Sequence, residues 1–427
     1  MEDDDDDQGS SDINTISSVA ELEERMPLHD GDVIVWKNGT YNNVNITLRS
    51  EGDVTEGIVF RAESNGGVIF TGNSTLQINS SNTTIKGFHW KDPIINSEHL
   101  VRFMTGTSNS TLTECVISGS NTTESYDRNC KWVSLYGRGH TVKNCSFVDK
   151  KDRGALVVVW FDEGVTPSHT IKNNYFTRPV MLIDPSDNEP ANEQESIRIG
   201  DSANSLSDGK VTVSGNYFYR CWGESAEVVS SKSCANTYSG NYFHECRGTL
   251  TMRHGNGCTV EGNYFLGNNV EESGGVRIIG EDHIVRNNHF ESLTGIGYKA
   301  ALSLVRGQEN AALSGYAQVK GALVENNVFN ECVLAMCVNY GGNNMTLPVV
   351  DSTIRNNILV STDNNNYIVN CYDTATESTI NWEGNTLYGR IKNNDVFSLS
   401  TTKTLPELEN VSAKRNAIAS AAGASWD

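Results

Sequence analysis

The sequence predicts an all-β fold, a single-domain right-handed parallel β-helix (a solenoid) with a short capping helix at its N-terminal end. Three observations support this prediction. A short phrase centred on asparagine recurs along most of the chain. Glycine is abundant, with 38 residues, and proline is scarce, with 8, which is typical of a protein with many turns and few helices. The 427 residues contain no long low-complexity break, and a solenoid reaches this length by adding coils to one core.

The recurring phrase reads apolar, polar, Gly or Asn, Asn, and then two residues that are often aromatic. Clear copies lie at residues 213–218, 238–243, 260–265 and 285–290, and their central asparagines are 25, 22 and 25 residues apart. Such periods are typical of solenoids, whereas a propeller blade needs about 40 residues and a leucine-rich repeat needs a leucine frame that is missing. We interpret the phrase as strand, bend and strand, with asparagines stacked from coil to coil.

The ten cysteines follow the same repeat. Cys115 and Cys145 occupy the central asparagine position in consecutive early copies, and three others lie five residues after theirs, namely Cys221, Cys246 and Cys332. Adjacent strands are about 4.8 Å apart, which suits a disulfide between coils. A stack of small buried thiols fits equally well, and the sequence leaves both alternatives open.

The repeat divides the chain into three segments. Residues 1–12 contain an acidic run and are expected to form a disordered tail. Residues 13–392 are predicted to form the β-helix. Its N-terminal strand edges need a cover, and the capping box Ser18-Val-Ala-Glu21 predicts a helix over residues 20–25 that supplies it. Residues 393–427 lose the repeat and are expected to form a C-terminal cap or extension.

The formal net charge of −20 argues against a nucleic-acid partner, because a duplex-binding surface needs a basic face. No apolar stretch is long enough to span a membrane. The chain as given shows no signal peptide. A secreted or periplasmic location is expected if a leader has been removed. The sequence does not indicate the oligomeric state.

Four cations stand out against this acidic background. Aligned on the repeat, Lys232, Arg253 and Arg277 fall on consecutive coils of one sheet, and Arg198 falls one coil earlier. Strand alternation predicts that all four point outward and form a single column. Like charges on adjacent strands repel one another, so the column indicates an anion-binding site more strongly than a solvated basic stripe.

Oxygen-bearing side chains occur on the coils that precede Arg253, namely Asn192, Glu195, Glu224 and Glu227. Carboxylate and amide oxygens are ligands that suit calcium. Because surface glutamates are common, this spacing alone is a weak signal.

These motifs resemble family six of the polysaccharide lyases, which holds alginate lyases and the dermatan-cleaving chondroitinase B. The resemblance covers most of the chain and is densest at residues 226–233, at Arg253-His-Gly255 and at residues 275–280. It implies that Lys232 is the catalytic base and Arg253 the catalytic acid. Arginine is a poor proton donor, so His254 or a water stays open for that step, and His254 could instead only brace Arg253.

The resemblance also implies a calcium ion held by an asparagine and two glutamates. Asn192 matches the asparagine, and Glu227 matches the second glutamate. The position of the first glutamate holds Ser225 here, and Glu224 lies one residue earlier. A shift of one residue turns a strand side chain to the other face, so Glu224 reaches the metal only if the strand has not yet begun. Glu224 or Glu195 is expected to provide the third oxygen. Because Ser225 replaces a charged ligand, the calcium affinity is expected to be reduced.

The implied function is β-elimination of an acidic 4-linked uronate polysaccharide, alginate first. A dermatan or chondroitin sulfate lyase is the alternative within the enzyme class, and a C5-epimerase is more distant. A non-catalytic glycan-binding β-helix is the alternative from another class. Arg198 and Arg277 are expected to bind the substrate carboxylate if calcium is absent. Arg306 could bind a further sugar or could be solvated.

Overall fold

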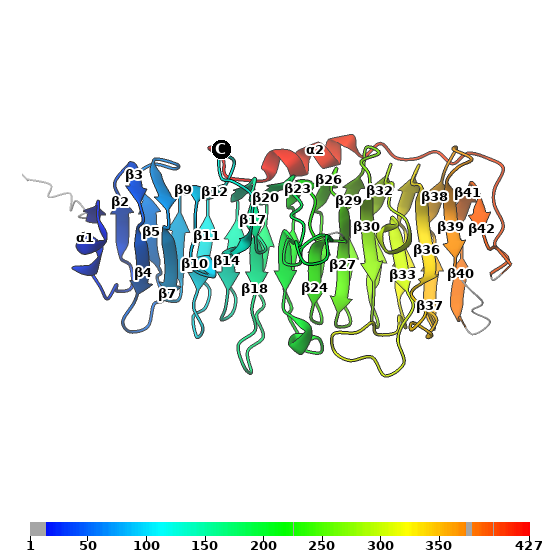
Figure 1. Cartoon of the computed structure of the whole chain (residues 1–427), viewed down its shortest axis with the longest axis horizontal. Coiled ribbons are helices and arrows are strands. Elements are labelled where there is room, and N and C mark those ends of the chain that lie inside the picture. Colours follow the sequence, from blue (N-terminus) through cyan, green and yellow to red (C-terminus); the bar gives the residue numbers. More distant parts are fainter. Residues whose placement is uncertain (1–13, 225, 373–377, 396) are drawn as a thin grey trace, which may run out of the picture.

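The computed structural model describes residues 14–224, 226–372, 378–395 and 397–427. The predicted acidic tail and Ser225 lie outside the described residues. Strands stack along the long axis of the molecule to form three long parallel sheets (Figure 1). Each full coil contributes one strand to each sheet, and the structure confirms the predicted right-handed parallel β-helix.

Sheet 1 has 14 strands among the described residues: β1 (Asn14–Ile16), β2 (Val33–Trp36), β5 (Ile58–Ala62), β8 (Thr83–Lys86), β11 (Thr111–Thr113), β15 (Thr141–Lys143), β19 (Thr170–Lys172), β22 (Thr212–Ser214), β25 (Thr237–Ser239), β28 (Thr259–Glu261), β31 (Ile284–Arg286), β34 (Leu323–Glu325), β37 (Ser352–Arg355) and β40 (Ile380–Glu383). Sheet 2 has 13 described strands: β4 (Asn45–Arg49), β7 (Thr75–Asn79), β10 (His99–Phe103), β14 (Lys131–Leu135), β18 (Val157–Val159), β21 (Ile197–Ile199), β24 (Glu227–Lys232), β27 (Gly248–His254), β30 (Ser273–Ile278), β33 (Leu302–Val305), β36 (Leu334–Tyr340), β39 (Tyr367–Cys371) and β42 (Ile391–Lys392).

Sheet 3 also has 13 described strands: β3 (Gly39–Asn42), β6 (Val68–Gly72), β9 (Phe88–Pro93), β12 (Val116–Ser118), β16 (Ser146–Val148), β20 (Tyr175–Arg178), β23 (Tyr217–Cys221), β26 (Tyr242–His244), β29 (Tyr264–Leu266), β32 (His289–Glu291), β35 (Val328–Asn330), β38 (Ile358–Val360) and β41 (Thr386–Tyr388). A small parallel pair joins β13 (Ser125–Asn129) to β17 (Asp152–Arg153), and two short 3-10 helices, η1 (Ser202–Asn204) and η2 (Gly297–Lys299), lie beside sheet 2.

The asparagine phrase forms the bend between sheets 1 and 3. The Asn241 amide illustrates the stack, because its oxygen accepts from the backbone N–H of Asn216 at 3.0 Å and its nitrogen donates to Asn263 at 2.9 Å. The preceding Gly240 has a φ of 61°, which is the left-handed conformation expected at this bend. The phenylalanines that follow stack inside the helix, with Phe218 and Phe243 ring centroids 4.5 Å apart. The repeat therefore forms both the bend and the continuous core.

The ten cysteines are free thiols in this structure, and nine of them are buried. Cys145 continues the asparagine stack, since its backbone N–H donates to the Asn174 oxygen at 3.0 Å. Of the two alternatives for the cysteines, the structure therefore has the stack of buried thiols and not disulfides between coils.

The two ends of the chain are placed differently. Helix α1 (Val19–Glu23) covers the N-terminal coil, and its cap residue Ser18 accepts from the Glu21 N–H at 3.2 Å, as the capping box predicts. Helix α2 (Ser412–Ala421) lies along the body beside sheet 3 instead of across the end (Figure 1). The indole of Trp426 then donates to the Glu114 carbonyl at 2.9 Å, so the C-terminal segment returns to an early coil. Among the described helices, neither is long and apolar enough to cross a membrane.

Candidate active site

The predicted cations lie on sheet 2 but do not form a single column. Arg198 pairs in register with Ser230, which pairs with Thr251, which in turn pairs with Arg277. Lys232 lies two residues further along β24. The predicted single column is therefore wrong. Lys232, Arg253 and Arg277 lie nine, ten and eleven residues before the asparagines of their copies of the phrase, and a bulge after Ser231 shifts the register further. The cations form two rows on the outer face of one sheet.

The same register shift displaces Arg253. Its guanidinium donates to the carbonyls of Ser314 at 3.1 Å and Gly315 at 3.0 Å, and it lies 4.5 Å above the ring of Tyr316. Its Nε lies 3.7 Å from Glu227. A loop more than 60 residues later in the chain therefore holds Arg253 in place, and the sequence contained no signal for this contact.

His254 is a neutral ring that lies between Arg253 and Ser202. Arg253 donates to its Nδ1 at 3.3 Å, and its Nε2 lies 3.3 Å from the hydroxyl of Ser202. Burial lowers the pKa of His254 to about 3, and the charges of Arg253 and Lys232 lower it further in the same direction. The ring therefore accepts from Arg253 and keeps its proton on Nε2, which makes it a brace that also carries a donor hydrogen.

Lys232 is half-buried at the end of β24, close to these groups. Within the described parts of the chain, no carboxylate lies within 4.0 Å of its ammonium group and its side chain makes no hydrogen bond. A lysine with no ion-pair partner inside a polar site is available to exchange a proton with a ligand.

Three carboxylates meet beside this lysine. One oxygen from each of Glu195, Glu224 and Glu227 lies within 4.8 Å of the others. Burial raises the pKa of Glu195, and burial together with Glu195 and Glu227 raises the pKa of Glu224 to about 9. Burial acts to raise the pKa of Glu227 as well, but Arg277 and Lys232 hold it below its ordinary value.

Arg277 contacts Glu227 directly, which accounts for much of the lowering of its pKa. One oxygen of Glu195 is buried and has no hydrogen-bond partner among the described residues. Since a buried carboxylate oxygen without a partner is costly, the cluster has the chemistry of a cation site.

The family model described as chondroitinase B matches residues 16–421. The chain belongs to the chondroitinase B family. This result confirms the resemblance to polysaccharide lyase family six that the motifs indicate. The chain has no significant match among curated protein sequences.

Solved structures of this family share the fold. The PL6 family alginate lyase AlyGC is 28% identical with a TM-score of 0.83, over 96% of this chain and 56% of that chain. The alginate lyase AlyF-OU02, solved in complex with G6, is 25% identical with a TM-score of 0.77, over 93% of this chain and 88% of that one. A PL6 family polysaccharide lyase from Pseudopedobacter saltans is 21% identical with a TM-score of 0.75, over 97% and 99%. The chain spans only about half of AlyGC.

The other predicted residues of this chondroitinase B family member lie on sheet 2 and its loops, at different distances along the chain from the cluster. Asn192 is exposed on the loop that precedes β21, and the neighbouring backbone N–H of Glu193 donates to Glu224 at 2.5 Å. Arg198 lies 3.6 Å from Glu193 and 5.0 Å above the ring of Trp160. Arg306 lies further along sheet 2, where it donates to the Thr346 carbonyl at 3.2 Å.

Buried residues that the sequence did not indicate hold the loop that carries Asn192 and Glu195. The amide of Gln194 bridges the loop, since it accepts from the Leu182 N–H at 2.8 Å and donates to the Ala191 carbonyl at 2.8 Å. Arg178 is fully buried below it and donates to the Gly154 carbonyl at 3.0 Å. Arg178 ends a strand whose other residues follow the core pattern of the repeat, so the sequence alone did not indicate that it supports this loop.

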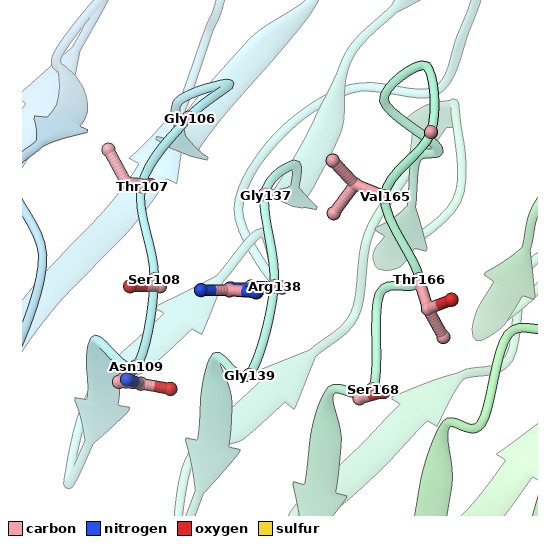
Figure 2. Close-up of a pocket in the computed structure, with 11 residues that line it drawn as sticks. Gly106, Thr107, Ser108, Asn109, Gly137, Arg138, Gly139, Val165, Thr166 and Ser168 are labelled. Atoms are coloured by element: carbon pink, nitrogen blue, oxygen red, sulfur yellow. The ribbon is translucent and has the colours of Figure 1, made fainter.

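A separate, larger cavity lies elsewhere on the molecule. A hollow of about 700 Å³ is formed by turns of three successive coils, at residues 106–109, 137–139 and 164–168 (Figure 2). Its described lining contains Arg138 but no carboxylate and no histidine. By contrast, His254 of the candidate site lines a smaller cavity of about 190 Å³. The chemistry therefore identifies the site, and cavity size does not.

Proposed function

We propose that the chain is a polysaccharide lyase that cleaves a 4-linked uronate polysaccharide, alginate first, by β-elimination. The observation that carries the proposal is the placement of Lys232. It has no ion-pair partner in the described structure, and it lies beside the neutral His254, the braced Arg253 and the carboxylate cluster. A proton acceptor, a fixed donor and a means of neutralising a carboxylate are the groups that this reaction requires.

In the proposed reaction the neutral amine of Lys232 removes the C5 proton of a uronate. The electron pair of that C–H bond forms the C4–C5 double bond, and the C4–O bond to the leaving sugar breaks. The leaving oxygen takes up a proton from water while the guanidinium of Arg253, whose position the carbonyls of Ser314 and Gly315 hold, donates a hydrogen bond to it. His254 carries a hydrogen on Nε2 and is the second candidate donor.

Calcium fits the carboxylate cluster. Glu195 has a buried oxygen without a partner among the described residues, and burial raises the pKa of both Glu195 and Glu224, so a bound cation would stabilise their charged forms. Glu195, Glu224 and Glu227 would hold the ion, with Asn192 as a further oxygen donor from the adjacent loop. When bound, a calcium ion neutralises the substrate carboxylate so that the neighbouring C5 proton becomes more acidic. Arg198 and Arg277 are the alternative partners for that carboxylate.

A substrate panel tests the proposal. The protein is incubated with mannuronate-rich alginate, guluronate-rich alginate, dermatan sulfate and pectate, and the ultraviolet absorbance of an unsaturated product is followed. We expect this absorbance to appear with alginate. Cleavage of dermatan sulfate alone would establish the second candidate, which the chondroitinase B family match favours. If no polymer yields an unsaturated product but glycan binding persists, the chain is a non-catalytic glycan-binding β-helix.

The proposed substrates are extracellular polymers, so the proposal includes a secreted or periplasmic location. An acidic polysaccharide is the expected partner, and the net charge of −20 continues to argue against nucleic acid.

A further inference from the structure

A row of three arginines extends along sheet 2 beyond the candidate active site. Arg102 pairs in register with Ser134, which pairs with Val158, which pairs with Arg198. Three strands further on, the same row reaches Arg277. Arg102, Arg198 and Arg277 therefore repeat every third strand, and the strand spacing places their backbones roughly 14 Å apart.

The sheet surface between Arg102 and Arg198 carries a stacked pair of aromatic rings. Tyr136 and Trp160 stack with their ring centroids 5.5 Å apart and an angle of 7° between the rings. Arg102 lies 4.6 Å above the ring of Tyr136, and Arg198 lies 5.0 Å above the ring of Trp160. Both rings are half-buried, so part of their surface faces the solvent. The two arginines therefore lie at the two ends of the ring stack, and the rings hold their guanidinium groups in place.

Arg102 differs from the other two arginines in its partners. Arg277 contacts Glu227, and Arg198 lies 3.6 Å from Glu193. Within the described residues, no carboxylate lies within 4.0 Å of the Arg102 guanidinium. The acid nearest in sequence, Glu98, instead pairs with Lys131 at 3.2 Å. In a chain with a net charge of −20, a half-buried arginine without an acid partner indicates an anionic ligand.

The row also has a definite beginning. The residues that precede Arg102 in register are Gln77 and Thr47, which carry no charge. The cation row therefore starts at Arg102 and runs toward the active site.

We propose that Arg102, held against the ring of Tyr136, forms a distal subsite that binds the carboxylate of a uronate, about three sugars from the one held at Arg198. The proposal rests on the proposed function, because it assumes that the polymer follows the row toward Lys232. A 4-linked pyranose advances a polysaccharide by about one strand spacing, so three strands correspond to about three sugars.

The odd spacing selects a class of polymer. In alginate every sugar carries a carboxylate, so a carboxylate is available at any whole number of sugars from Arg198. In dermatan sulfate the uronate alternates with a sulfated hexosamine, so a spacing of three sugars brings a sulfate ester instead of a carboxylate to Arg102. A carboxylate therefore reaches the subsite only from a polymer with a uronate at every position.

The test compares Arg102→Ala with Arg138→Gln on alginate oligomers of four and eight sugars. Arg138 is an exposed arginine only two residues after Tyr136, on the turn that lines the cavity in Figure 2, so it controls for loss of nearby charge. Two quantities are measured for each protein: kcat/KM on both oligomers, and the Kd of the octamer by calorimetry with Lys232→Ala as the background. A melting temperature for each variant checks the fold.

For Arg102→Ala we expect the ratio of kcat/KM on the octamer to that on the tetramer to fall about tenfold, with a similar rise in the octamer Kd. Arg102→Lys should recover part of the ratio, and Arg138→Gln should leave it unchanged. An unchanged ratio and Kd in Arg102→Ala, or an equal change in Arg138→Gln, would overturn the distal subsite while the lyase function stands. If no oligomer is cleaved but the octamer Kd still rises in Arg102→Ala only, the subsite stands and the lyase function is wrong.

Discussion

Lys232 on β24 and His254 on β27 are paired in register on adjacent strands, and each lies nine residues before the asparagine of its own copy of the phrase, Asn241 and Asn263. The register shift between Ser231 and Lys232 adds one residue, Arg253, to β27 opposite β24. As a result His254 stacks next to the lysine, while Arg253 swings toward the carbonyls of Ser314 and Gly315. The bulge separates the proposed base from the proposed donor.

The first prediction follows from this separation of roles. Lys232→Ala should lower kcat on alginate by about 10²–10⁴-fold, the range for loss of a general base, and should change the Kd of an alginate oligomer much less. Turnover is followed by product absorbance and binding by calorimetry. Lys172→Ala, on sheet 1, removes the same charge away from the site and should leave both quantities unchanged. A Lys232→Ala variant with near-normal kcat would show that another group removes the proton.

The second prediction concerns calcium. Dialysis against a chelator should abolish turnover, and added calcium should restore it. Glu224→Gln should raise the calcium concentration needed for half-maximal activity by about 10–100-fold, because it removes a charged ligand. Glu51→Gln, at an exposed position, is the matched control.

The pH dependence of calcium binding should have a definite sign. Without a metal, the pKa of Glu224 is raised to about 9, so this group holds a proton at neutral pH. Calcium must displace that proton, and the apparent calcium affinity should therefore increase as the pH rises toward 9. Full activity after complete metal removal would contradict the calcium assignment, and Arg198 or Arg277 would then hold the substrate carboxylate.

The parts of the molecule that the sequence predicts are those that repeat. Each asparagine or aromatic residue of the phrase contacts the equivalent residue of the next coil. The neighbours of a residue such as Asn241 can therefore be read from the repeat alone. The same register identifies Lys232 and Arg253 as members of one sheet. Contacts made by the loops that leave the coil do not repeat, so the sequence spacing does not predict them. The carbonyl of Gly315 reaches Arg253 across 62 residues, and the spacing of the repeat contains no information about that distance.

The third prediction tests the asparagine stack. Asn241→Ala removes an acceptor for the backbone N–H of Asn216 and a donor to the Val213 carbonyl, both in a fully buried bend. Leaving buried polar groups unpaired costs about 1–3 kcal/mol each, so the melting temperature should fall clearly. Asn344→Ala, at an exposed turn position, should have little effect on it. Equal melting temperatures for the two variants would show that the stack contributes little to stability.

The fourth prediction concerns a second stack of side chains, at the bend between sheets 2 and 1, that the repeat analysis did not identify. Here the backbone N–H of one coil donates to a side chain of the next. Cys258 donates to Nδ1 of His283 at 3.1 Å, and Val211 donates to the oxygen of Asn236 at 3.0 Å. The neutral ring of His283 therefore accepts the same kind of hydrogen bond that the amide oxygen of Asn236 accepts. His140 and His169 accept in the same way from earlier coils.

Burial lowers the pKa of His283 to about 4, whereas an unfolded histidine has a pKa of about 6.5. The folded state therefore excludes a proton that the unfolded state binds below that value. The resulting stability is fully present above pH 6.5 and is lost as the pH falls toward 4. His283→Asn keeps the acceptor and removes the titration, so its melting temperature should fall less between pH 7 and pH 5 than that of the unmodified protein. His29→Asn, at an exposed position, should not change the slope. If His283→Asn loses as much stability in acid as the unmodified protein, the neutral ring of His283 is not a source of acid sensitivity.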